Sequence, residues 1–287
     1  MNTCILGLYE KAQPDAIVLE EKLDNAARAG FDSFELSVDE SDQRLARLAW
    51  GSAQTEALRQ AARRAGIPVG TLCLSGHRRY SLGSADPETV RRGMDILQRA
   101  IALAGELGVR LIQLAGYDVY YEPSTPDTVK RFTDNLLRGV EWAAGAGVML
   151  GFETMECVSP AGEPILDTVS KAMHFVRLAD SPWLQVYPDT GNVCNACGGD
   201  TAAVLADMCC GRGHIAAVHL KETVHGVFRD LFPGEGRVDF PAVIDGLKAQ
   251  GVRRFTAECW YRSGDDWKAR LKAVHAYYRP MLEVQKA

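Results

Sequence analysis

Gly147-Val-Met-Leu-Gly-Phe-Glu153 holds the structural unit that this sequence repeats. Its first glycine follows a helical pattern that runs from Thr125 to Ala146, and an apolar run of strand length comes next. Glycine adopts the left-handed conformation that commonly ends a helix, so the chain can pass there directly from helix to strand. The unit therefore predicts a β-strand that carries Glu153 at its carboxyl end.

The same succession of helix, glycine and strand recurs at Gly30, Gly66, Gly108 and Gly251. Strands are predicted at Cys4 to Leu8, Ser33 to Ser37, Ile67 to Leu74, Val109 to Leu114, Val148 to Phe152, Leu184 to Tyr187, Ala217 to Leu220 and Phe255 to Cys259. Helices are predicted at Leu19 to Ala29, Ala53 to Ala65, Glu88 to Leu107, Thr125 to Ala146, Ile165 to Leu178, Thr201 to Cys209, Pro241 to Gln250 and Asp266 to Glu283. This alternation is typical of βα units and favours a parallel sheet.

Eight βα units in 287 residues predict an α/β protein with a single (β/α)8 TIM barrel, a fold of about 250 residues. No linker or low-complexity tract divides the chain, so one domain is expected over residues 1–287. The structural alternative is a doubly wound open sheet that binds a dinucleotide. Such a sheet would carry a G-x-G-x-x-G turn after its first strand, and the segment Gly7-Leu-Tyr-Glu-Lys11 lacks that pattern.

Composition restricts the partners. The net charge of −5 argues against nucleic acid as the main partner. No apolar stretch approaches the roughly 20 residues that span a bilayer, so no membrane partner is expected. The first residues, Met1 to Leu6, lack the basic region and cleavage site of a secretory signal. Eight cysteines in a chain of this length do not form a disulfide scaffold, and a cytoplasmic location is predicted.

Four residues of metal-binding type each lie at the end of a short, largely apolar run: Glu153, Asp189, His219 and Glu258. Taken singly, a glutamate there can be a solvated loop residue, Asp189 can make an Asx-turn, and His219 can be a core histidine. Taken together, they follow the fifth to eighth strands, whose carboxyl ends meet at the functional rim of a barrel. Three carboxylates and an imidazole would repel or strain one another there without a cation. The pattern predicts one divalent metal ion, and Mn, Mg, Co and Zn all remain open.

Such a site suggests a chemistry. A divalent ion on a carbonyl or hydroxyl oxygen acts as a Lewis acid. Glu153 and Glu258 can then flank a bound carbon from two faces, one removing a proton while the other returns it. Acid–base catalysis of this kind contributes about 10²- to 10⁴-fold in rate. The two glutamates therefore predict inversion at a carbon next to a carbonyl.

Longer segments carry a family resemblance. They are Gly7-Leu-Tyr-Glu-Lys-Ala12, the segment from Ser37 to Leu48, the segment from Cys73 to Ser84, Ile112-Gln-Leu-Ala-Gly-Tyr-Asp-Val-Tyr-Tyr121, Tyr187-Pro-Asp-Thr-Gly-Asn192, His214 to Lys221 and Phe232 to Phe240. Through them the sequence resembles the L-ribulose-5-phosphate 3-epimerases, also called L-xylulose-5-phosphate 3-epimerases, of the xylose-isomerase-like barrel superfamily. The resemblance extends over nearly the whole chain.

The resemblance implies a function. It makes Glu153, Asp189, His219 and Glu258 the metal ligands and the two glutamates the acid–base pair. It also implies a phosphorylated L-pentulose as substrate, a role in L-ascorbate degradation and association into homodimers.

Several residues are candidate substrate contacts. His77, Arg78 and Arg79 follow the third strand, and arginine offers a fork of donors to phosphate; a solvated basic loop is the alternative. Lys221 shares a strand face with His219, two residues before it, and can reach a sugar or phosphate oxygen. Asn192 favours the sugar-phosphate branch of the family, and Glu156 can bond a substrate hydroxyl.

Other features stay open at this point. Gly234-Glu-Gly236 can wrap an anion or form a plain turn. Cys194-Asn-Ala-Cys197 and the segment from Thr154 to Pro164 depart from the family pattern, and the cysteines are interpreted as surface-loop residues rather than a zinc site. Alternative functions are a sugar isomerase or free-ketose 3-epimerase on the same metal site, a repair endonuclease, and a sugar-binding protein without activity.

Overall fold

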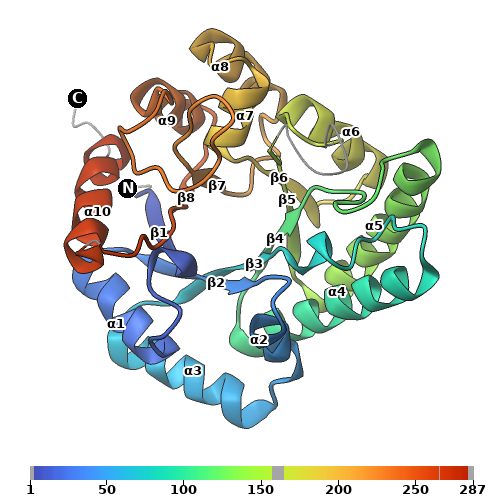
Figure 1. Cartoon of the computed structure of the whole chain (residues 1–287), viewed down its shortest axis with the longest axis horizontal. Coiled ribbons are helices and arrows are strands. Elements are labelled where there is room, and N and C mark those ends of the chain that lie inside the picture. Colours follow the sequence, from blue (N-terminus) through green and yellow to red (C-terminus); the bar gives the residue numbers. More distant parts are fainter. Residues whose placement is uncertain (1–2, 157–164, 265, 284–287) are drawn as a thin grey trace.

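The computed structural model describes residues 3–156, 165–264 and 266–283. Its strands form a ring at the centre, and the helices surround this ring (Figure 1). The strands are β1 (Ile5–Tyr9), β2 (Ser33–Val38), β3 (Val69–Leu74), β4 (Leu111–Ala115), β5 (Met149–Glu153), β6 (Leu184–Tyr187), β7 (Val218–Leu220) and β8 (Arg254–Ala257). Each predicted strand is found within two residues of its expected ends.

The described strands form one parallel sheet in the order β6-β5-β4-β3-β2-β1-β8-β7. The remaining gap, between β6 and β7, is narrowed by two isolated parallel bridges, Val186 to Ile215 and Asp189 to His219. The sheet is therefore a nearly closed barrel, which confirms the predicted (β/α)8 fold. The single domain over residues 1–287 stays a prediction.

The larger helices also follow the sequence pattern. They are α1 (Leu19–Ala29), α3 (Ser52–Ala65), α4 (Pro87–Leu107), α5 (Pro126–Ala146), α6 (Val169–Ala179), α8 (Thr201–Cys210), α9 (Phe240–Ala249) and α10 (Trp267–Leu282). Helix α6 begins four residues later than predicted, after its cap at Thr168. Two short helices, α2 (Asp42–Leu45) and α7 (Thr190–Ala196), lie between them. The short helices α2 and α7 were not predicted, because one or two turns give no readable apolar period. Asp189, interpreted alternatively as an Asx-turn residue, caps α7 instead.

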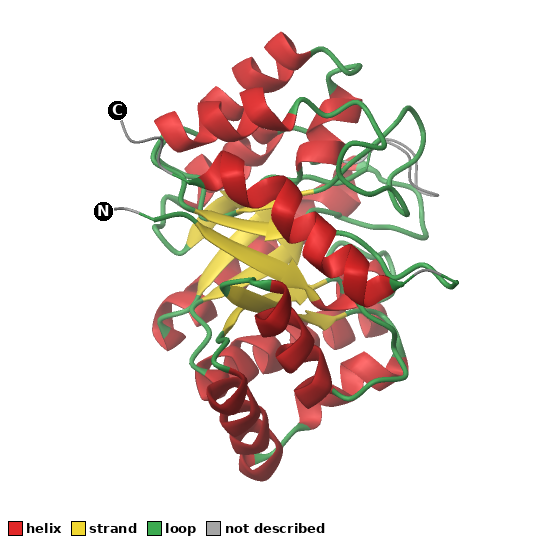
Figure 2. Cartoon of the chain, turned by 90° about the vertical axis from the view of Figure 1, so that its left-hand side faces the viewer, coloured by secondary structure: helices red, strands yellow, loops and turns green. Residues whose placement is uncertain are grey.

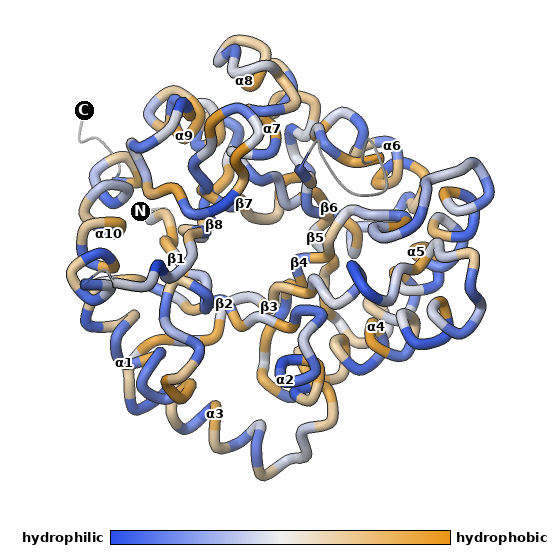
Figure 3. The backbone as a smooth tube through the Cα atoms, viewed as in Figure 1, coloured by the Kyte–Doolittle hydropathy of each residue, from blue (hydrophilic) through white to orange (hydrophobic). Residues whose placement is uncertain are grey.

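The apolar core lies between the strands and the enclosing helices (Figure 2). Phe132 of α5, Phe152 of β5 and Phe175 of α6 pack there with ring centroids 5.8 Å apart. The peripheral helices alternate hydrophobic and hydrophilic positions, as amphipathic helices on a barrel must (Figure 3). No helix of the described residues is long and apolar enough to cross a membrane.

The barrel interior contains buried polar side chains. The hydroxyl of Tyr187 on β6 donates to the carboxylate of Glu35 on β2, although these strands are not neighbours in the sheet. The two side chains therefore meet across the interior. Both are fully buried, so their polar atoms need partners inside the barrel.

Candidate metal centre

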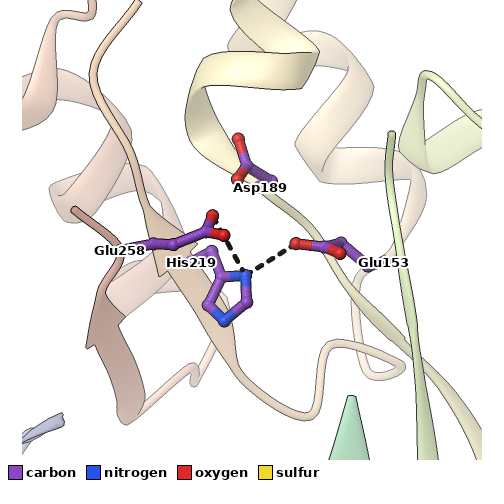
Figure 4. Close-up of side chains that lie close together, drawn as sticks. All are labelled: Glu153, Asp189, His219 and Glu258. Atoms are coloured by element: carbon purple, nitrogen blue, oxygen red, sulfur yellow. Dashed lines mark hydrogen bonds and ion pairs between the residues drawn. The ribbon is translucent and has the colours of Figure 1, made fainter. Parts of the chain in front are cut away.

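The four predicted ligands, which lie at or near the carboxyl ends of the last four strands, come together at one site (Figure 4). Glu153 ends β5, Asp189 follows β6, His219 lies within β7, and Glu258 follows β8. Each offers one ligand atom, and these atoms all lie within 4.8 Å of one another. All four residues are buried, so their charges must be balanced locally.

The contacts inside the cluster join its members through His219. Its Nδ1 lies 2.7 Å from Oε1 of Glu153 and 3.4 Å from Oε2 of Glu258. Lys221 supplies a second cation, with Nζ 2.8 Å from Oδ2 of Asp189 and 3.7 Å from Oε2 of Glu258. Three carboxylates thus share one imidazole and one ammonium.

Burial and mutual charge shift the pKa values of the cluster. Burial raises the pKa of Asp189 to about 8 despite Lys221, and burial also raises that of Glu153. Burial opposes protonation of His219, yet the carboxylates of Glu35, Glu258 and Glu153 raise its pKa well above the ordinary value. The cluster therefore binds protons tightly in the absence of another cation, as expected of a site built for a positive charge.

The donor set fits a divalent ion. It combines carboxylate oxygens with one imidazole nitrogen, a mixture that suits Mn, Mg, Co or Zn. Oδ2 of Asp189 and Oε2 of Glu258 are buried and lie beside the Lys221 ammonium, but neither receives a hydrogen bond of suitable geometry among the described residues. Buried acceptors left in this way are the atoms that a bound cation would satisfy.

Neighbouring polar groups hold the carboxylates in place. The amide of Gln113 on β4 donates to Oε2 of Glu153. The Asp189 backbone N–H donates to Oγ1 of Thr154 at 2.9 Å, and the Asn192 N–H donates to Oδ1 of Asp189 at 2.7 Å. The Asn192 side-chain amide closes this loop by donating to the Thr154 carbonyl oxygen at 2.8 Å. Gln113 and Thr154 were missed from the sequence, because a lone amide or hydroxyl at a strand end carries no pattern.

Gly116, in the turn after β4, lies close to the backbone of Glu153. A Cβ atom at Gly116 would overlap the carbonyl oxygen of Glu153. The turn after β4 can therefore approach the end of β5 closely only without a side chain at this position.

Arg78 is the member of the basic segment His77-Arg78-Arg79, after β3, that lies beside the cluster. Its guanidinium lies 3.6 Å from Oε1 of Glu156 and 5.4 Å from the centroid of the Tyr120 ring. Burial would raise the pKa of Glu156, but Arg78 and then Lys221 lower it. Glu156, Arg78 and Lys221 therefore belong to one electrostatic group beside the four predicted ligands.

The other two members of the string lie differently. The His77 ring is buried, with Nε2 3.0 Å from the carbonyl oxygen of Gly93 in α4. Arg79 is half exposed and pairs with Asp42 at 3.1 Å. Their predicted contact with phosphate stays a prediction, and these contacts do not support it.

Two further features have definite places. The Gly234 N–H, considered for anion binding, donates to Oε2 of Glu222 at 3.0 Å, so it is already used. The interpretation of the cysteines as surface-loop residues is wrong for Cys194, which is buried within α7, while Cys197 is half-buried at the end of that helix. Neither belongs to the four-residue cluster. Residues 157–164 of the segment from Thr154 to Pro164 lie outside the described residues.

The Lys221 ammonium lies over the Trp260 ring near the cluster. The Lys221 ammonium lies 5.9 Å from the centroid of the Trp260 ring, and the Arg229 guanidinium lies 5.7 Å from it. Tyr9 meets the same indole edge-on at 5.8 Å. The tryptophan thus brings β1, the β7 loop and the β8 loop together.

Comparisons with known proteins identify the family of this chain. The family model of the xylose isomerase-like TIM barrel matches residues 23–281. The L-ribulose-5-phosphate 3-epimerases UlaE of Escherichia coli and Escherichia fergusonii are each 42% identical over 278 residues, which cover 96% of this chain and 94% of the relative.

Solved structures show the same fold at lower identity. An L-ribulose 3-epimerase has a TM-score of 0.76 at 23% identity, covering 97% of this chain and 94% of its own. A D-psicose 3-epimerase, determined in the presence of D-fructose, has a TM-score of 0.80 at 16% identity, covering 97% and 99%. With the close sequence relatives, this places the chain as an isomerase-class enzyme in the L-ribulose-5-phosphate 3-epimerase family of the xylose isomerase-like TIM barrels.

Proposed function

We propose that this enzyme interconverts L-xylulose 5-phosphate and L-ribulose 5-phosphate by metal-dependent epimerisation at C3. The observation that carries the proposal is the pair Glu153 and Glu258, which reach one buried cluster from the separate strands β5 and β8. Both relatives quoted above are named for 3-epimerisation of a pentulose phosphate.

The two glutamates supply the proton transfers. One carboxylate removes the proton from C3, and the electron pair left on carbon is delocalised onto the neighbouring C2 carbonyl. The other glutamate, protonated, returns a proton to the opposite face of C3. No electron is gained or lost overall, so the reaction needs no redox cofactor.

Glu153, Asp189, His219 and Glu258 would hold one divalent ion. When bound, it would supply Lewis-acid stabilisation of negative charge on the substrate oxygens. The native metal, among Mn, Mg, Co and Zn, is part of what the experiment below determines.

Substrate recognition falls to the groups beside the cluster. Arg78 offers a guanidinium next to Glu156, and Lys221 offers an ammonium between Asp189 and Glu258. We assign Arg78 and Lys221 to the sugar phosphate and Glu156 to a hydroxyl, because these groups are charged and adjacent to the predicted ligands, with Lys221 and Glu156 buried and Arg78 half-buried. Asn192, His77 and Arg79 complete the predicted set of substrate contacts.

The experiment is solvent deuterium exchange at C3 of each epimer, with the metal content measured on the same samples. The metal-loaded enzyme should exchange both epimers and interconvert them. Glu153→Gln and Glu258→Gln should each abolish interconversion, and each should retain exchange in the epimer that the remaining glutamate deprotonates.

Glu10→Gln, which changes a buried glutamate outside the cluster, serves as the matched control and should keep interconversion. Interconversion without exchange, or undiminished activity in both glutamine variants, would refute the two-glutamate mechanism.

A free-ketose 3-epimerase or a sugar isomerase on the same site is the second candidate, favoured by the structural likeness to a D-psicose 3-epimerase. A panel of phosphorylated and free pentuloses distinguishes them, since our proposal requires higher kcat/KM for the phosphorylated sugar. A role in L-ascorbate degradation, a cytoplasmic location and a homodimeric state belong to the proposal as well, supported by the family resemblance.

A further inference from the structure

Glu35 is a buried carboxylate that the proposed reaction does not use. It lies within β2, on the far side of His219 from the three carboxylates of the cluster, and its exposed fraction is 0%. A charged group at such depth is costly unless every oxygen has a partner. Its partners therefore indicate why it is there.

Both oxygens of Glu35 are fully engaged. Oε1 lies 2.7 Å from Nε2 of His219. Oε2 accepts hydrogen bonds from Thr71 Oγ1 on β3 at 2.7 Å and from the Tyr187 hydroxyl on β6 at 2.9 Å. The Tyr187 oxygen lies in turn 3.0 Å from Thr256 Oγ1 on β8. With two hydroxyl donors on one oxygen, Glu35 is an ionised acceptor.

This arrangement decides which ring nitrogen of His219 faces the cluster. A neutral imidazole has one N–H and one lone pair, and a carboxylate can only accept. Both ring nitrogens lie 2.7 Å from a carboxylate oxygen, Nε2 from that of Glu35 and Nδ1 from that of Glu153. A cation at Nδ1, the nitrogen directed towards Glu153 and Glu258 (Figure 4), would displace any proton there. The one remaining N–H would then be at Nε2, where Glu35 receives it.

We propose that Glu35 is a positioning residue that fixes the tautomer and ring orientation of His219, so that Nδ1 is held ready to bind a divalent cation with the three carboxylates. The inference rests on the proposed metal site. A carboxylate behind a metal-binding histidine typically contributes 10- to 100-fold in metal affinity. Thr71 and Tyr187 hold Glu35 itself, so the support runs from β3 and β6 through β2 to β7.

A purely structural role is the rival explanation. In that case Glu35 would only neutralise a buried charge, and its replacement would lower stability without changing how His219 meets a cation. Glu10 is the matched control, since it is equally buried but hydrogen-bonds Arg47 and the Ser37 N–H instead.

The test measures the dissociation constant of Co²⁺ by competition with a chelating dye, in the whole protein. Glu35→Gln should weaken binding about 10- to 100-fold, because the amide keeps an acceptor but loses the charge. Glu35→Met should weaken it further. Glu10→Gln should bind Co²⁺ within about threefold of the unchanged protein even though its melting temperature falls.

The ring geometry is read separately by ¹⁵N NMR of the Zn²⁺-loaded protein, in which a metal at one ring nitrogen leaves one N–H. The unchanged protein should show that proton at Nε2, and Glu35→Met should show a mixture of rings that bind Zn²⁺ through Nδ1 and through Nε2. If Glu35→Gln fails to fold, Thr71→Val and Tyr187→Phe each remove one hydroxyl from Oε2 and should weaken Co²⁺ binding by a smaller factor.

Unchanged Co²⁺ affinity in the Glu35 variants, together with an Nε2 proton in all of them, would overturn the inference while leaving the proposed function intact. A protein that binds no Co²⁺, Mn²⁺, Mg²⁺ or Zn²⁺ yet epimerises would overturn both. Weakened binding in Glu35→Gln with full recovery of kcat at saturating metal would support the inference.

Discussion

Lys221 and Asp189 form a buried ion pair, with 2.8 Å between Nζ and Oδ2. Burial would lower the pKa of Lys221, but Asp189 and Glu258 outweigh it and raise the pKa. The ammonium therefore stays charged and partly balances the carboxylates of the cluster. The proposed metal would share this task, and the two cations are expected to compensate for one another.

Lys221→Met should accordingly destabilise the metal-free enzyme strongly. Removing one partner of a buried ion pair typically costs about 3–5 kcal/mol, because the remaining charge is left uncompensated. Urea unfolding in the presence of a chelator measures this loss. Saturating Mn²⁺ should recover more stability in Lys221→Met than in the unchanged enzyme. Lys268→Met, at an exposed position, should change the free energy of unfolding by no more than about 0.5 kcal/mol, both with chelator and with Mn²⁺.

Metal affinity should rise with pH. The raised pKa of His219 means that its ring carries a proton at neutral pH that must leave as Nδ1 binds the metal. The dissociation constant for Mn²⁺ should therefore fall steadily from pH 6 to pH 8. Calorimetry in buffers of different ionisation enthalpy should register protons released on binding. A dissociation constant independent of pH would contradict this expectation.

His77 should make the fold sensitive to acid. Burial lowers its pKa from 6.5 to about 4, so the unfolded chain binds a proton that the folded protein resists. The free energy of unfolding that depends on a neutral His77 is fully present above pH 6.5. It falls by about 3 kcal/mol as the pH falls towards 4. His77→Gln should reduce the loss of unfolding free energy between pH 7 and pH 4. His225→Gln, at an exposed position, should leave that loss unchanged.

Arg78→Met should impair the phosphorylated substrate more than the free sugar. Hydrogen bonds to charged groups contribute about 1.5–3 kcal/mol, which corresponds to roughly 10- to 100-fold in kcat/KM. Steady-state kinetics on L-ribulose 5-phosphate and L-ribulose measures the difference. Arg79→Met should have the smaller effect, because Arg79 is half exposed and pairs with Asp42. Equal losses on both sugars would exclude Arg78 as a phosphate contact.

The local chain pattern was enough to predict the barrel and its rim. Gly147 ends α5 in the left-handed conformation, and Glu153 ends β5, as the pattern around them indicates. The same reasoning placed Asp189, His219 and Glu258 at one end of the barrel. Helix ends and strand lengths are set by neighbouring residues, and parallel βα units bring strand ends together by topology alone.

The contacts across the barrel depended on the tertiary structure. Glu35 and His219 lie 184 positions apart in the sequence, and their hydrogen bond depends on how the strands are registered around the ring. Likewise, nothing in the string His77-Arg78-Arg79 shows that its members lie in such different surroundings, one of them buried against α4. The sequence thus determined which residues reach the rim, because periodicity and turns are local. Only folding decided which atoms meet, because strand register and side-chain direction are properties of the closed sheet.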